Sequence, residues 1–284
     1  MGKSTLLNGF LGEKVAIVSE KPETTRDNIR GILTMKDCQI TFIDTPGLHK
    51  PHDLLGKMMV TRAQSTIMET DLILFVTERN KAFGKDDMSI IARLPTPQEN
   101  KKVIMVINKV DTVKDKKTLL PIMEKALTLY PFAEVVPVSA LNKKDIEKLL
   151  DIIKSYLPKG PFFYPDDQLT DREPDFMIQE IIREKVLNQT YEEIPHAIAV
   201  VVDVAEEDEE KRVFNIYATI FVERPSQKGI IIGKSGAMIK RITDRAKSDI
   251  EKFLDRKVNI ELWVKVREKW KKDPNALKEM GYSD

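Results

Sequence analysis

The chain is short of the residues that build disulfides and zinc sites. Its 284 residues include a single cysteine, Cys38, and three histidines. One cysteine excludes a disulfide framework within the chain and fits the reducing cytosol. Structural zinc sites use four ligands of which at least two are cysteines, so with one cysteine no site of that kind is expected. Cys38 stands at the start of an apolar strand pattern, and we interpret it as a packing residue.

The sequence also lacks long hydrophobic runs and an excess of charge of one sign. No apolar run approaches the roughly 18 residues of a membrane-spanning helix, and no signal peptide is visible. Charged residues make up 32% of the chain and hydrophobic residues 42%, with a net charge of +1. This composition is typical of a soluble globular protein, and the length is sufficient for two domains. The net charge identifies no partner, because like charges can still gather on one surface.

Apolar patterns in the first half of the chain alternate between strands and helices. The runs 71–76 and 103–107 are continuously apolar, as in strands buried on both faces of a parallel sheet. The alternation predicts a doubly wound α/β domain over 1–157, with ligands bound at the carboxyl ends of its strands. Strands are predicted over 29–35, 40–43, 71–76, 103–107 and 135–138, and helices over 3–11, 56–68, 86–94, 119–129 and 146–157.

The first residues resemble the end of a phosphate-binding loop. Gly2, Lys3 and Ser4 directly precede an apolar helical pattern, as does the Gly-Lys-Ser/Thr end of a P-loop. Lys3 would reach the β- and γ-phosphates at the helix N-terminus, and the Ser4 hydroxyl would bind Mg²⁺. The motif normally opens with a glycine five residues earlier, just after a strand. Only Met1 precedes Gly2, so half of the loop and its strand are absent from the sequence.

Two later segments suit the magnesium and γ-phosphate side of such a site. Asp44 follows the strand over 40–43 and could hold Mg²⁺ through water, while the Gly47 N–H could approach a γ-phosphate. Thr25 is our choice for the switch threonine that senses the γ-phosphate through Mg²⁺, and Thr24 is the alternative. Ser4 and Thr25 are therefore the expected metal ligands. The expected catalytic set is Lys3, Thr25, Asp44 and Gly47, with Gly2, Ser4, Thr5, Thr45, Pro46 and Leu48 also at the nucleotide.

Segments after the next two strands suit recognition of guanine. The Asp111 carboxylate, in Asn-Lys-Val-Asp, can accept two hydrogen bonds from the guanine edge that adenine does not offer. The stem of Lys109 can lie over the base, and Asn108 can tie neighbouring loops together. The N–H of Ala140, after Ser139, could meet the guanine oxygen.

Each of these segments alone also fits an ordinary turn or a solvated loop. Their order along the chain is what a GTPase requires, and independent motifs in the right structural context reinforce one another. The sequence therefore predicts a GTPase-type domain that uses GTP, GDP and Mg²⁺.

A proline-rich stretch over 158–175 predicts a linker, and a second domain follows over 176–284. Its pattern places a helix first, then two strands, two helices and a last strand, which is the order of an α+β type II KH fold. The acidic run 206–210 is expected at the tip of a hairpin. Predicted elements are helices over 176–187 and 237–253, a helical turn over 230–232, and strands over 197–204, 212–222 and 258–266.

A glycine-flanked loop in this second domain predicts RNA binding. Gly233-Lys234-Ser235-Gly236 lies between an apolar helical turn and a long basic helix, where a KH domain clamps a nucleic-acid backbone. Glycines let phosphates approach closely, and lysine and the helix N-terminus supply positive potential. A plain glycine turn between two helices is the alternative. The expected RNA-binding residues are Gly233, Lys234, Ser235, Gly236, Lys240 and Arg241.

The whole chain resembles the Era family of bacterial ribosome-assembly GTPases, of the TrmE-Era-EngA-like group, in which a G domain precedes a C-terminal KH domain. The resemblance implies GTP hydrolysis, binding to the 3′ end of 16S ribosomal RNA, and a role in maturation of the 30S subunit. It also implies a cytoplasmic monomer with peripheral association at the inner face of the cell membrane. The segments that carry it are 2–8, 24–26, 44–49, 108–111, 181–185, 232–236 and 261–266.

Two departures from the GTPase pattern affect these expectations. Leu48 stands where signalling GTPases have a glutamine that orients the attacking water, so another group must orient it. Slow intrinsic hydrolysis that accelerates on RNA or ribosome binding would follow. The other departure is the absent start of the P-loop.

In the family, the absent strand lies between the strands that end at Asp44 and at Thr77. We therefore expect the strands over 40–43 and 72–76 to lie about two strand spacings apart, roughly 9–10 Å, without direct hydrogen bonds. A valine codon misread as a start would explain Met1, and the hypothesis is a clipped gene whose full-length form is the working GTPase.

Two other functions stay open. One is an RNA-binding protein whose nucleotide domain is inactive, and the other is a double-domain assembly GTPase whose KH-like module lacks the RNA clamp. A single set of GTPase motifs and the intact loop over 233–236 count against the latter. Binding of GTP, GDP and ATP separates the former from the preferred function.

Overall fold

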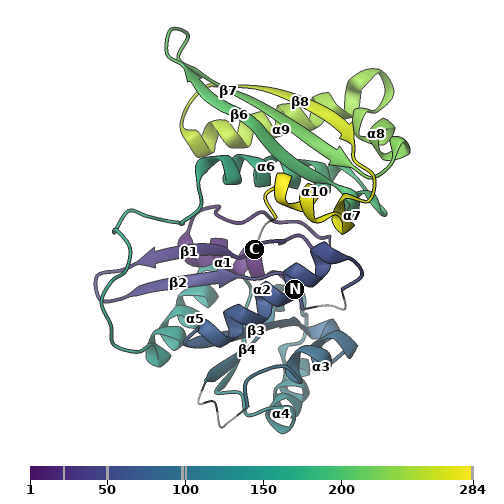
Figure 1. The fold of residues 1–284 in the computed structure, drawn as a ribbon. Helices are drawn as coiled ribbons and strands as arrows, with labels where there is room; N and C mark the ends of the chain where they lie inside the picture. Colours follow the sequence, from purple (N-terminus) through teal and green to yellow (C-terminus); the bar gives the residue numbers. More distant parts are fainter. Residues whose placement is uncertain (22, 49–50, 97–98, 100, 283–284) are drawn as a thin grey trace. The chain divides into compact units, whose positions relative to one another are not determined.

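The computed structural model describes residues 1–21, 23–48, 51–96, 99 and 101–282, so His49 of the 44–49 motif lies outside the described residues. The chain divides into two compact units (Figure 1). The first comprises Met1–Ala16, Thr25–Lys50 and Met59–Asp171, and the second Ile17–Thr24, Pro51–Met58 and Arg172–Asp284. No helix in the described part of the chain is long and apolar enough to cross a membrane.

The first unit is built around a parallel sheet of order β3-β4-β5 and an antiparallel hairpin β1-β2. Its helices connect successive strands, as the alternating sequence pattern predicts. The elements in chain order are α1 (Lys3–Leu11), β1 (Ile29–Thr34), β2 (Gln39–Asp44), α2 (Leu54–Glu69), β3 (Leu72–Glu78), α3 (Lys85–Ile91), β4 (Lys102–Asn108), α4 (Leu120–Leu129), β5 (Glu134–Pro137) and α5 (Lys143–Tyr156).

Strand β4 is buried on both of its faces, because successive side chains of a strand point in opposite directions. Ile104 and Val106 pack in one apolar cluster with residues of α1 and α5. Met105 and Ile107 pack in the other cluster, with residues of α3 and α4. Helices therefore cover both faces of the parallel sheet, and the polar residues after its strands gather at one edge.

The hairpin β1-β2 and the sheet β3-β4-β5 are separate sheets among the described residues. As expected from the sequence, the strands over 40–43 and 72–76 are not hydrogen-bonded to each other there.

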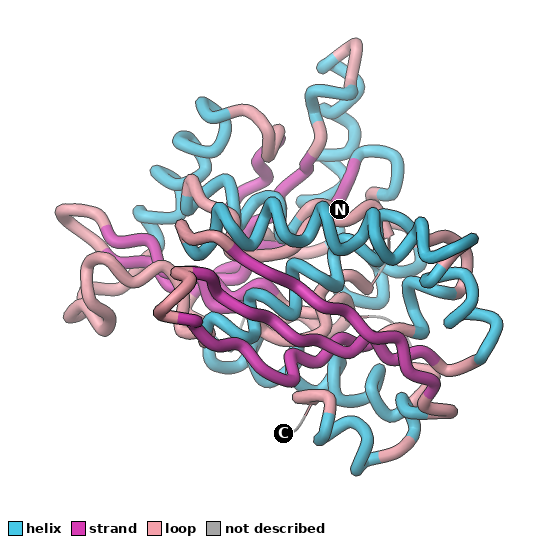
Figure 2. The backbone as a smooth tube through the Cα atoms, turned by 90° about the horizontal axis from the view of Figure 1, so that it is seen from above, coloured by secondary structure: helices cyan, strands magenta, loops and turns pink. Residues whose placement is uncertain are grey.

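The second unit has a three-stranded sheet of order β6-β7-β8, whose strands run side by side in Figure 2. β6 and β7 are antiparallel and β7 and β8 parallel. Its α/β order, with α6 before the strands and β8 last, is that of the predicted type II KH fold. Its elements are α6 (Pro174–Gln189), α7 (Ile194–Ala197), β6 (Ala199–Asp208), β7 (Val213–Val222), α8 (Pro225–Ile232), α9 (Ala237–Leu254), β8 (Val258–Val266) and α10 (Pro274–Glu279).

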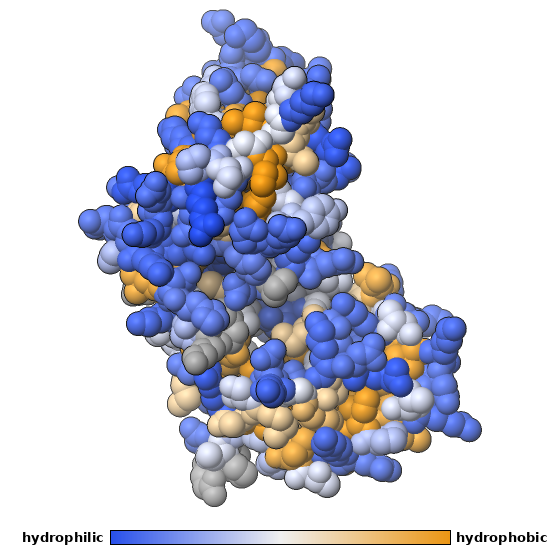
Figure 3. All heavy atoms as spheres, turned by 90° about the vertical axis from the view of Figure 1, so that its right-hand side faces the viewer, coloured by the Kyte–Doolittle hydropathy of each residue, from blue (hydrophilic) through white to orange (hydrophobic). Residues whose placement is uncertain are grey.

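One face of this sheet packs against the helices. Ile178 and Ile182 of α6 and Ile242 of α9 share an apolar cluster with Ile216 and Ile220 of β7. On the outward-facing positions, Trp263 stacks on Tyr217 with ring centroids 5.9 Å apart and stays 41% exposed. Exposed hydrophobic side chains otherwise come in small groups on a mostly hydrophilic surface, as the face drawn in Figure 3 shows.

The structure differs from the expected linker over 158–175. Residues up to Asp171 group with the first unit, and α6 already begins at Pro174. The Ile32 N–H donates to Leu169 O at 2.8 Å, and the Thr170 hydroxyl donates to Arg30 O at 2.7 Å. The stretch thus pairs with the exposed edge of β1, which satisfies backbone groups that composition alone does not reveal.

The expected domain bounds of 1–157 and 176–284 also miss two short segments. Residues 17–24 and 51–58 group with the second unit although they lie in the first half of the chain. The acidic run predicted at the hairpin tip likewise differs, since its first part, through Asp208, belongs to β6.

Candidate functional site

Three oxygen-bearing side chains meet in the first unit at the start of α1. The Ser4 hydroxyl donates to Asp44 Oδ2 at 2.6 Å. The Thr25 hydroxyl donates to the same oxygen at 3.2 Å and lies 3.2 Å from Ser4 Oγ. Residues 21 and 40 positions away from Ser4 are thus brought together, as the motif order predicts. Thr24 is turned elsewhere, with its hydroxyl donating to Lys21 O.

Asp44 is the buried centre of this cluster, with 5% of its surface exposed. Burial raises the pKa of its carboxyl, against the opposing influence of Lys3 and of the hydroxyls of Ser4 and Thr25. Its second oxygen, Oδ1, is buried without a hydrogen-bond partner. An orphaned carboxylate oxygen beside two hydroxyls is a donor set that fits Mg²⁺, which prefers oxygen ligands.

Gly2 sits where only glycine fits. Its φ of 86° lies in the left-handed region, and a Cβ there would come within 2.5 Å of Asn108 Nδ2. Asn108 is itself buried and donates to Met1 O while its Oδ1 accepts from the N–H groups of Lys109 and Ala140. The sequence-based expectation that Asn108 ties neighbouring loops together agrees with this geometry.

The predicted guanine-side residues follow β4. Asp111 is exposed in the short turn Val110–Thr112, and Lys109 has a left-handed φ of 63°. The Lys109 ammonium lies 2.8 Å from Glu78 Oε1 at the end of β3. Burial would raise the pKa of Glu78, but hydrogen bonds from Lys109 and the chain's amino group lower it from 4.5 to about 2. Glu78 thus holds the loop that presents Asp111.

The loop after β5 is held by hydrogen bonds from its backbone N–H groups. The Ala140 N–H, predicted to meet guanine, donates to Asn108 Oδ1 at 3.0 Å. The Ser139 N–H donates to Asp145 Oδ2 at 2.9 Å, and Ser139 is buried. In this structure both N–H groups therefore hold the loop together, and the Ala140 N–H is already engaged by a protein acceptor.

Sequence reasoning missed Glu78 and Asp145. The signal for Asp145 was a capping pattern, because Asn142 caps α5 and an acidic residue follows within the first turn. Glu78 directly ends a buried strand, at the edge where ligands bind in such sheets.

The remaining predicted residues of this site lie where the motifs place them. Gly47 and Leu48 follow the end of β2, and both are half-buried. Leu48 carries no polar group that could orient water. Lys3 is the first residue of α1, and Thr5 lies in the first turn of that helix. Thr45 is half-buried and Pro46 buried.

The predicted RNA loop of the second unit joins α8 to α9. Gly233 has a φ of 72°, and a Cβ there would come within 2.7 Å of Met238 Cβ. Ser235 and Gly236 also have left-handed φ values, of 51° and 79°. This backbone turns sharply and leaves Lys234 and Ser235 exposed before the N-terminus of the 18-residue helix α9. The loop can therefore present N–H groups and one ammonium to an anion.

Exposed cations surround that loop. Lys240 and Arg241 lie on the first turns of α9 and are exposed. Within the described ranges, Lys234, Lys240 and Arg241 form no ion pair with a carboxylate. Their charge is therefore available to phosphate.

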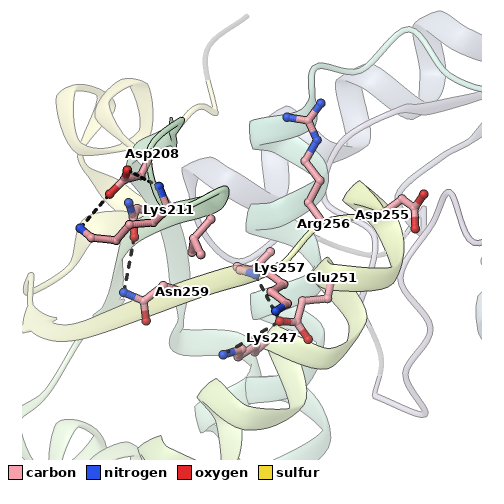
Figure 4. A pocket seen from close by; sticks show the side chains of 11 residues that line it. Asp208, Lys211, Lys247, Glu251, Asp255, Arg256, Lys257 and Asn259 are labelled. Carbon is pink, nitrogen blue, oxygen red and sulfur yellow. Dashed lines mark hydrogen bonds and ion pairs between the residues drawn. The ribbon is translucent and has the colours of Figure 1, made fainter.

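A hollow of about 850 Å³ lies at the opposite end of α9, at the tip of the β6-β7 hairpin (Figure 4). Two of its cations are paired with carboxylates of the same hollow, since Lys211 lies 2.9 Å from Asp208 and Lys247 lies 4.0 Å from Glu251. The Arg256 guanidinium extends away from this group in Figure 4. Paired charges make this hollow a weaker phosphate site than the Gly233–Gly236 loop.

Known protein families match both units. Residues 1–109 match the family described as "50S ribosome-binding GTPase", and residues 193–271 match the family described as "KH domain". GTPase Era of Clostridium kluyveri is 46% identical over 282 residues, which cover 99% of this chain and 95% of the relative. GTPase Era of Syntrophus aciditrophicus is 46% identical over 284 residues, covering 100% of this chain and 92% of the relative.

Solved structures agree with this match. A crystal structure of Era in complex with MgGDPNP and nucleotides 1506–1542 of 16S ribosomal RNA has a TM-score of 0.96 at 38% identity, covering 100% of this chain and 95% of that one. A variant of Aquifex aeolicus Era bound to GDP·AlF4⁻ has a TM-score of 0.95 at 38% identity, with the same coverage. Since relatives, domain families and fold agree over the whole length, the chain belongs to the Era family of GTPases.

Proposed function

We propose that this protein hydrolyses GTP with Mg²⁺ and binds the 3′ end of 16S ribosomal RNA during assembly of the 30S subunit. The observation that carries the proposal is the cluster of Ser4, Thr25 and the buried Asp44 at the start of α1. Relatives bound to MgGDPNP with 16S RNA, and to GDP·AlF4⁻, support the choice of ligands.

The phosphate side of the site is assigned to residues at the start of α1 and the end of β2. Ser4 and Thr25 would hold Mg²⁺ through their hydroxyl oxygens, and Asp44 would act on it through water. Bound Mg²⁺ would neutralise charge on the β- and γ-phosphate oxygens. Lys3 adds its ammonium to those phosphates, and the Gly47 N–H approaches the γ-phosphate without a side chain in the way.

The guanine side is assigned to the loop after β4. Asp111 would accept two hydrogen bonds from guanine, and the Lys109 stem would cover the base. Asn108 holds this loop against Met1 and Ala140, so the base and phosphate sides keep a fixed relation. Selectivity rests on the unpaired Asp111 carboxylate that adenine would leave behind.

Hydrolysis should be slow without a partner, because the side chain of Leu48 cannot orient water. A group supplied or ordered on RNA or ribosome binding would complete the site. We therefore expect GTP hydrolysis to be faster when the 30S subunit is bound.

RNA binding is assigned to the loop Gly233–Gly236 with Lys240 and Arg241. KH domains clamp about four nucleotides with such a loop. The exposed ammonium of Lys234 and the N-terminus of α9 suit backbone phosphates, while exposed Trp263 offers a ring to a base.

The protein should work as a monomer where 30S subunits mature, in the cytoplasm, with a peripheral fraction at the inner face of the membrane. Fractionation of cells, with and without a high-salt wash, tests that location. A salt-resistant membrane fraction would contradict peripheral association.

Equilibrium binding tests the proposal as a whole. GTP, GDP and ATP are titrated with Mg²⁺ into the chain, with and without an RNA fragment from the 3′ end of 16S ribosomal RNA. The expected result is binding of both guanine nucleotides, weak binding of ATP, and RNA binding that a scrambled RNA does not reproduce. Equal binding of GTP and ATP, or of both RNAs, would contradict it.

A second candidate is an RNA-binding protein whose nucleotide domain no longer binds GTP. The separation of β1-β2 from β3-β4-β5 among the described residues favours it, because a strand edge without ladder partners loses hydrogen bonds. RNA binding without any guanine-nucleotide binding in the same titrations would select this candidate.

A further inference from the structure

The C-terminal half of helix α2 carries two polar side chains, Arg62 and Thr66, that lie on one face because they are one turn apart. This end of the helix is itself held in place. The Lys101 ammonium donates to the backbone oxygens of Ile67 and Thr70 at 3.1 and 3.0 Å. A cation suits the carbonyl groups that a helix leaves unpaired at its C-terminus. Arg62 and Thr66 therefore stand on a fixed support within the first unit.

Arg62 forms an ion pair with the segment that follows Thr25. Its Nη1 donates to Asp27 Oδ1 at 2.8 Å. The two side chains are 17% and 16% exposed, so water and salt screen the pair less than a pair on the open surface. The same carboxylate oxygen accepts from the N–H of Asn28 at 2.8 Å. The ion pair thus holds both the Asp27 side chain and the backbone next to it.

Thr66 makes a second contact with the same segment. Asn28 Nδ2 donates to Thr66 Oγ1 at 2.8 Å, and Thr66 is 6% exposed. The Thr66 hydroxyl in turn donates to Arg62 O at 2.9 Å, which orients it to accept from Asn28. The next residue, Ile29, begins β1 and is 1% exposed. Residues 27 and 28 are therefore held to α2 at two points, directly before a buried strand residue.

These contacts limit the movement of Thr25, which lies two residues before Asp27. Consecutive Cα atoms are about 3.8 Å apart, so a residue so close to a held position has little freedom to leave it. The Thr25 hydroxyl is the one that meets Asp44 and Ser4. A threonine on a loose segment would reach this position only part of the time, at an entropic cost.

We propose that Arg62 is a positioning residue for the Thr25 hydroxyl, acting through Asp27, with the Asn28–Thr66 bond as a second point of attachment. Its role is exerted through the protein and needs no contact with the nucleotide. All of these residues belong to the first unit. The nucleotide part of this inference rests on the proposed function of Thr25, whereas the anchoring of residues 27 and 28 does not.

The test compares the double variant Arg62→Met with Asp27→Asn against the single variant Asp27→Asn. The double variant leaves no charge unpaired, and in both variants an amide oxygen at position 27 can still accept from the Asn28 N–H. Only the single variant keeps the donor from Arg62. Hydrogen–deuterium exchange is measured on the amides of residues 25–29 in the nucleotide-free full chain.

We expect exchange about tenfold faster in the double variant than in the single one, as loss of a hydrogen bond from a charged group predicts. A matched control places the same change at an exposed arginine of the first unit, as Arg93→Met with Asp27→Asn. Exchange in this control should equal that of the single variant. Equal exchange in the Arg62 double variant and the single variant would overturn the proposal.

A second measurement separates positioning from a merely structural role. The affinities for GDP and for a non-hydrolysable GTP analogue are measured with Mg²⁺ in the two double variants. We expect the Arg62 variant to lose about tenfold of its preference for the triphosphate relative to the Arg93 control, while GDP affinity stays constant, in the range of ordinary coupling between sites. An equal loss for both nucleotides would show a structural role and overturn the proposal. If the unsubstituted chain binds neither nucleotide, the proposed function fails, and the exchange measurement still decides whether Arg62 holds the segment.

Discussion

The tripeptide Gly-Lys-Ser occurs twice in this chain, and the two copies have different surroundings. In the first unit, Ser4 is half-buried and its hydroxyl donates to Asp44. In the second, Ser235 is exposed and has a left-handed φ of 51°. The first copy begins helix α1 directly, whereas the second forms the turn between α8 and α9. The residues around each copy, and not the tripeptide itself, therefore decide which ligand the copy suits.

The charges around the two copies also differ, since the first copy faces a carboxylate and the second lies among cations. The first faces a buried carboxylate with an orphaned oxygen, which suits a cation that bridges to phosphates. The second is flanked by exposed Lys240 and Arg241 and has no buried carboxylate among its described neighbours. A cationic loop of this kind suits the backbone of RNA, whose affinity should therefore fall with salt.

The largest expected effect tests the guanine side of the first unit. Asp111→Asn replaces the carboxylate with an amide that suits the 2-oxo group of xanthine. The ratio of GTP to xanthosine triphosphate affinity should fall by about 10⁴-fold, the discrimination typical of a hydrogen-bonding group that the bound base covers. RNA binding should not change. Unaltered guanine preference, measured by competition binding, would remove Asp111 from the site.

The next effect tests the second copy of the tripeptide. The double variant Lys234→Asp with Ser235→Asp puts negative charge where phosphate would sit. RNA affinity should fall about 100-fold, since a hydrogen bond to a charged group contributes about 1.5–3 kcal/mol. Circular dichroism and melting should stay close to wild type because both residues are exposed.

A matched control for that variant is available at the opposite end of α9. Lys257→Asp with Asn259→Asp changes the net charge by the same amount in the hollow drawn in Figure 4. RNA affinity measured at one salt concentration should fall much less in this control. An equal fall in both variants would assign the effect to overall charge and not to the loop.

A smaller effect sharpens the assignment of the switch threonine. Thr25→Val removes the hydroxyl that meets Asp44 and should cost the triphosphate about tenfold in affinity relative to GDP. Thr24→Val removes a hydroxyl that donates to Lys21 O and should leave the preference unchanged. Loss of preference in the Thr24 variant alone would reverse the assignment. Titrations with Mg²⁺ present and absent provide the measurement.

The smallest effect concerns stability and pH. The folded pKa of Asp44 is raised by burial, so the folded state binds more protons than the unfolded state above the usual pKa of 3.8. Stability contributed by this group therefore falls as pH rises through the window between the two values. Asp44→Asn should raise the melting temperature of the nucleotide-free chain at pH 7 by about 2–4 °C for each kcal/mol gained. The same variant should lose Mg²⁺-dependent GTP binding. A lower melting temperature at pH 7 would contradict the buried-charge argument.

Much of the fold follows from the sequence because its patterns are local. The helix α1 begins and ends where the apolar period and Gly12 predict, at Lys3 and Leu11. Strand β8 spans Val258–Val266 as its alternation predicts. Asp44 and Asn108 are the last residues of β2 and β4, so their placement at the carboxyl ends of strands followed from the strand pattern.

The unpredicted contacts are those that join distant parts of the chain. The pairing of residues 169–170 with β1 uses backbone groups, which leave no mark on composition. The bond from Arg183 to Thr24 spans 159 positions, and nothing local to either residue indicates it. The engagement of the Ala140 N–H by Asn108 depends on the close approach of two loops, which motif order alone does not give.

The most direct test replaces, in separate variants, the lysine of each copy of the tripeptide. Lys3→Ala and Lys234→Ala are each assayed for GTP binding and, without nucleotide, for binding of the 16S 3′ RNA fragment. The account predicts that Lys3→Ala weakens GTP binding and leaves RNA binding unchanged, and that Lys234→Ala does the reverse. Loss of GTP binding in Lys234→Ala, or loss of RNA binding in Lys3→Ala, would contradict it.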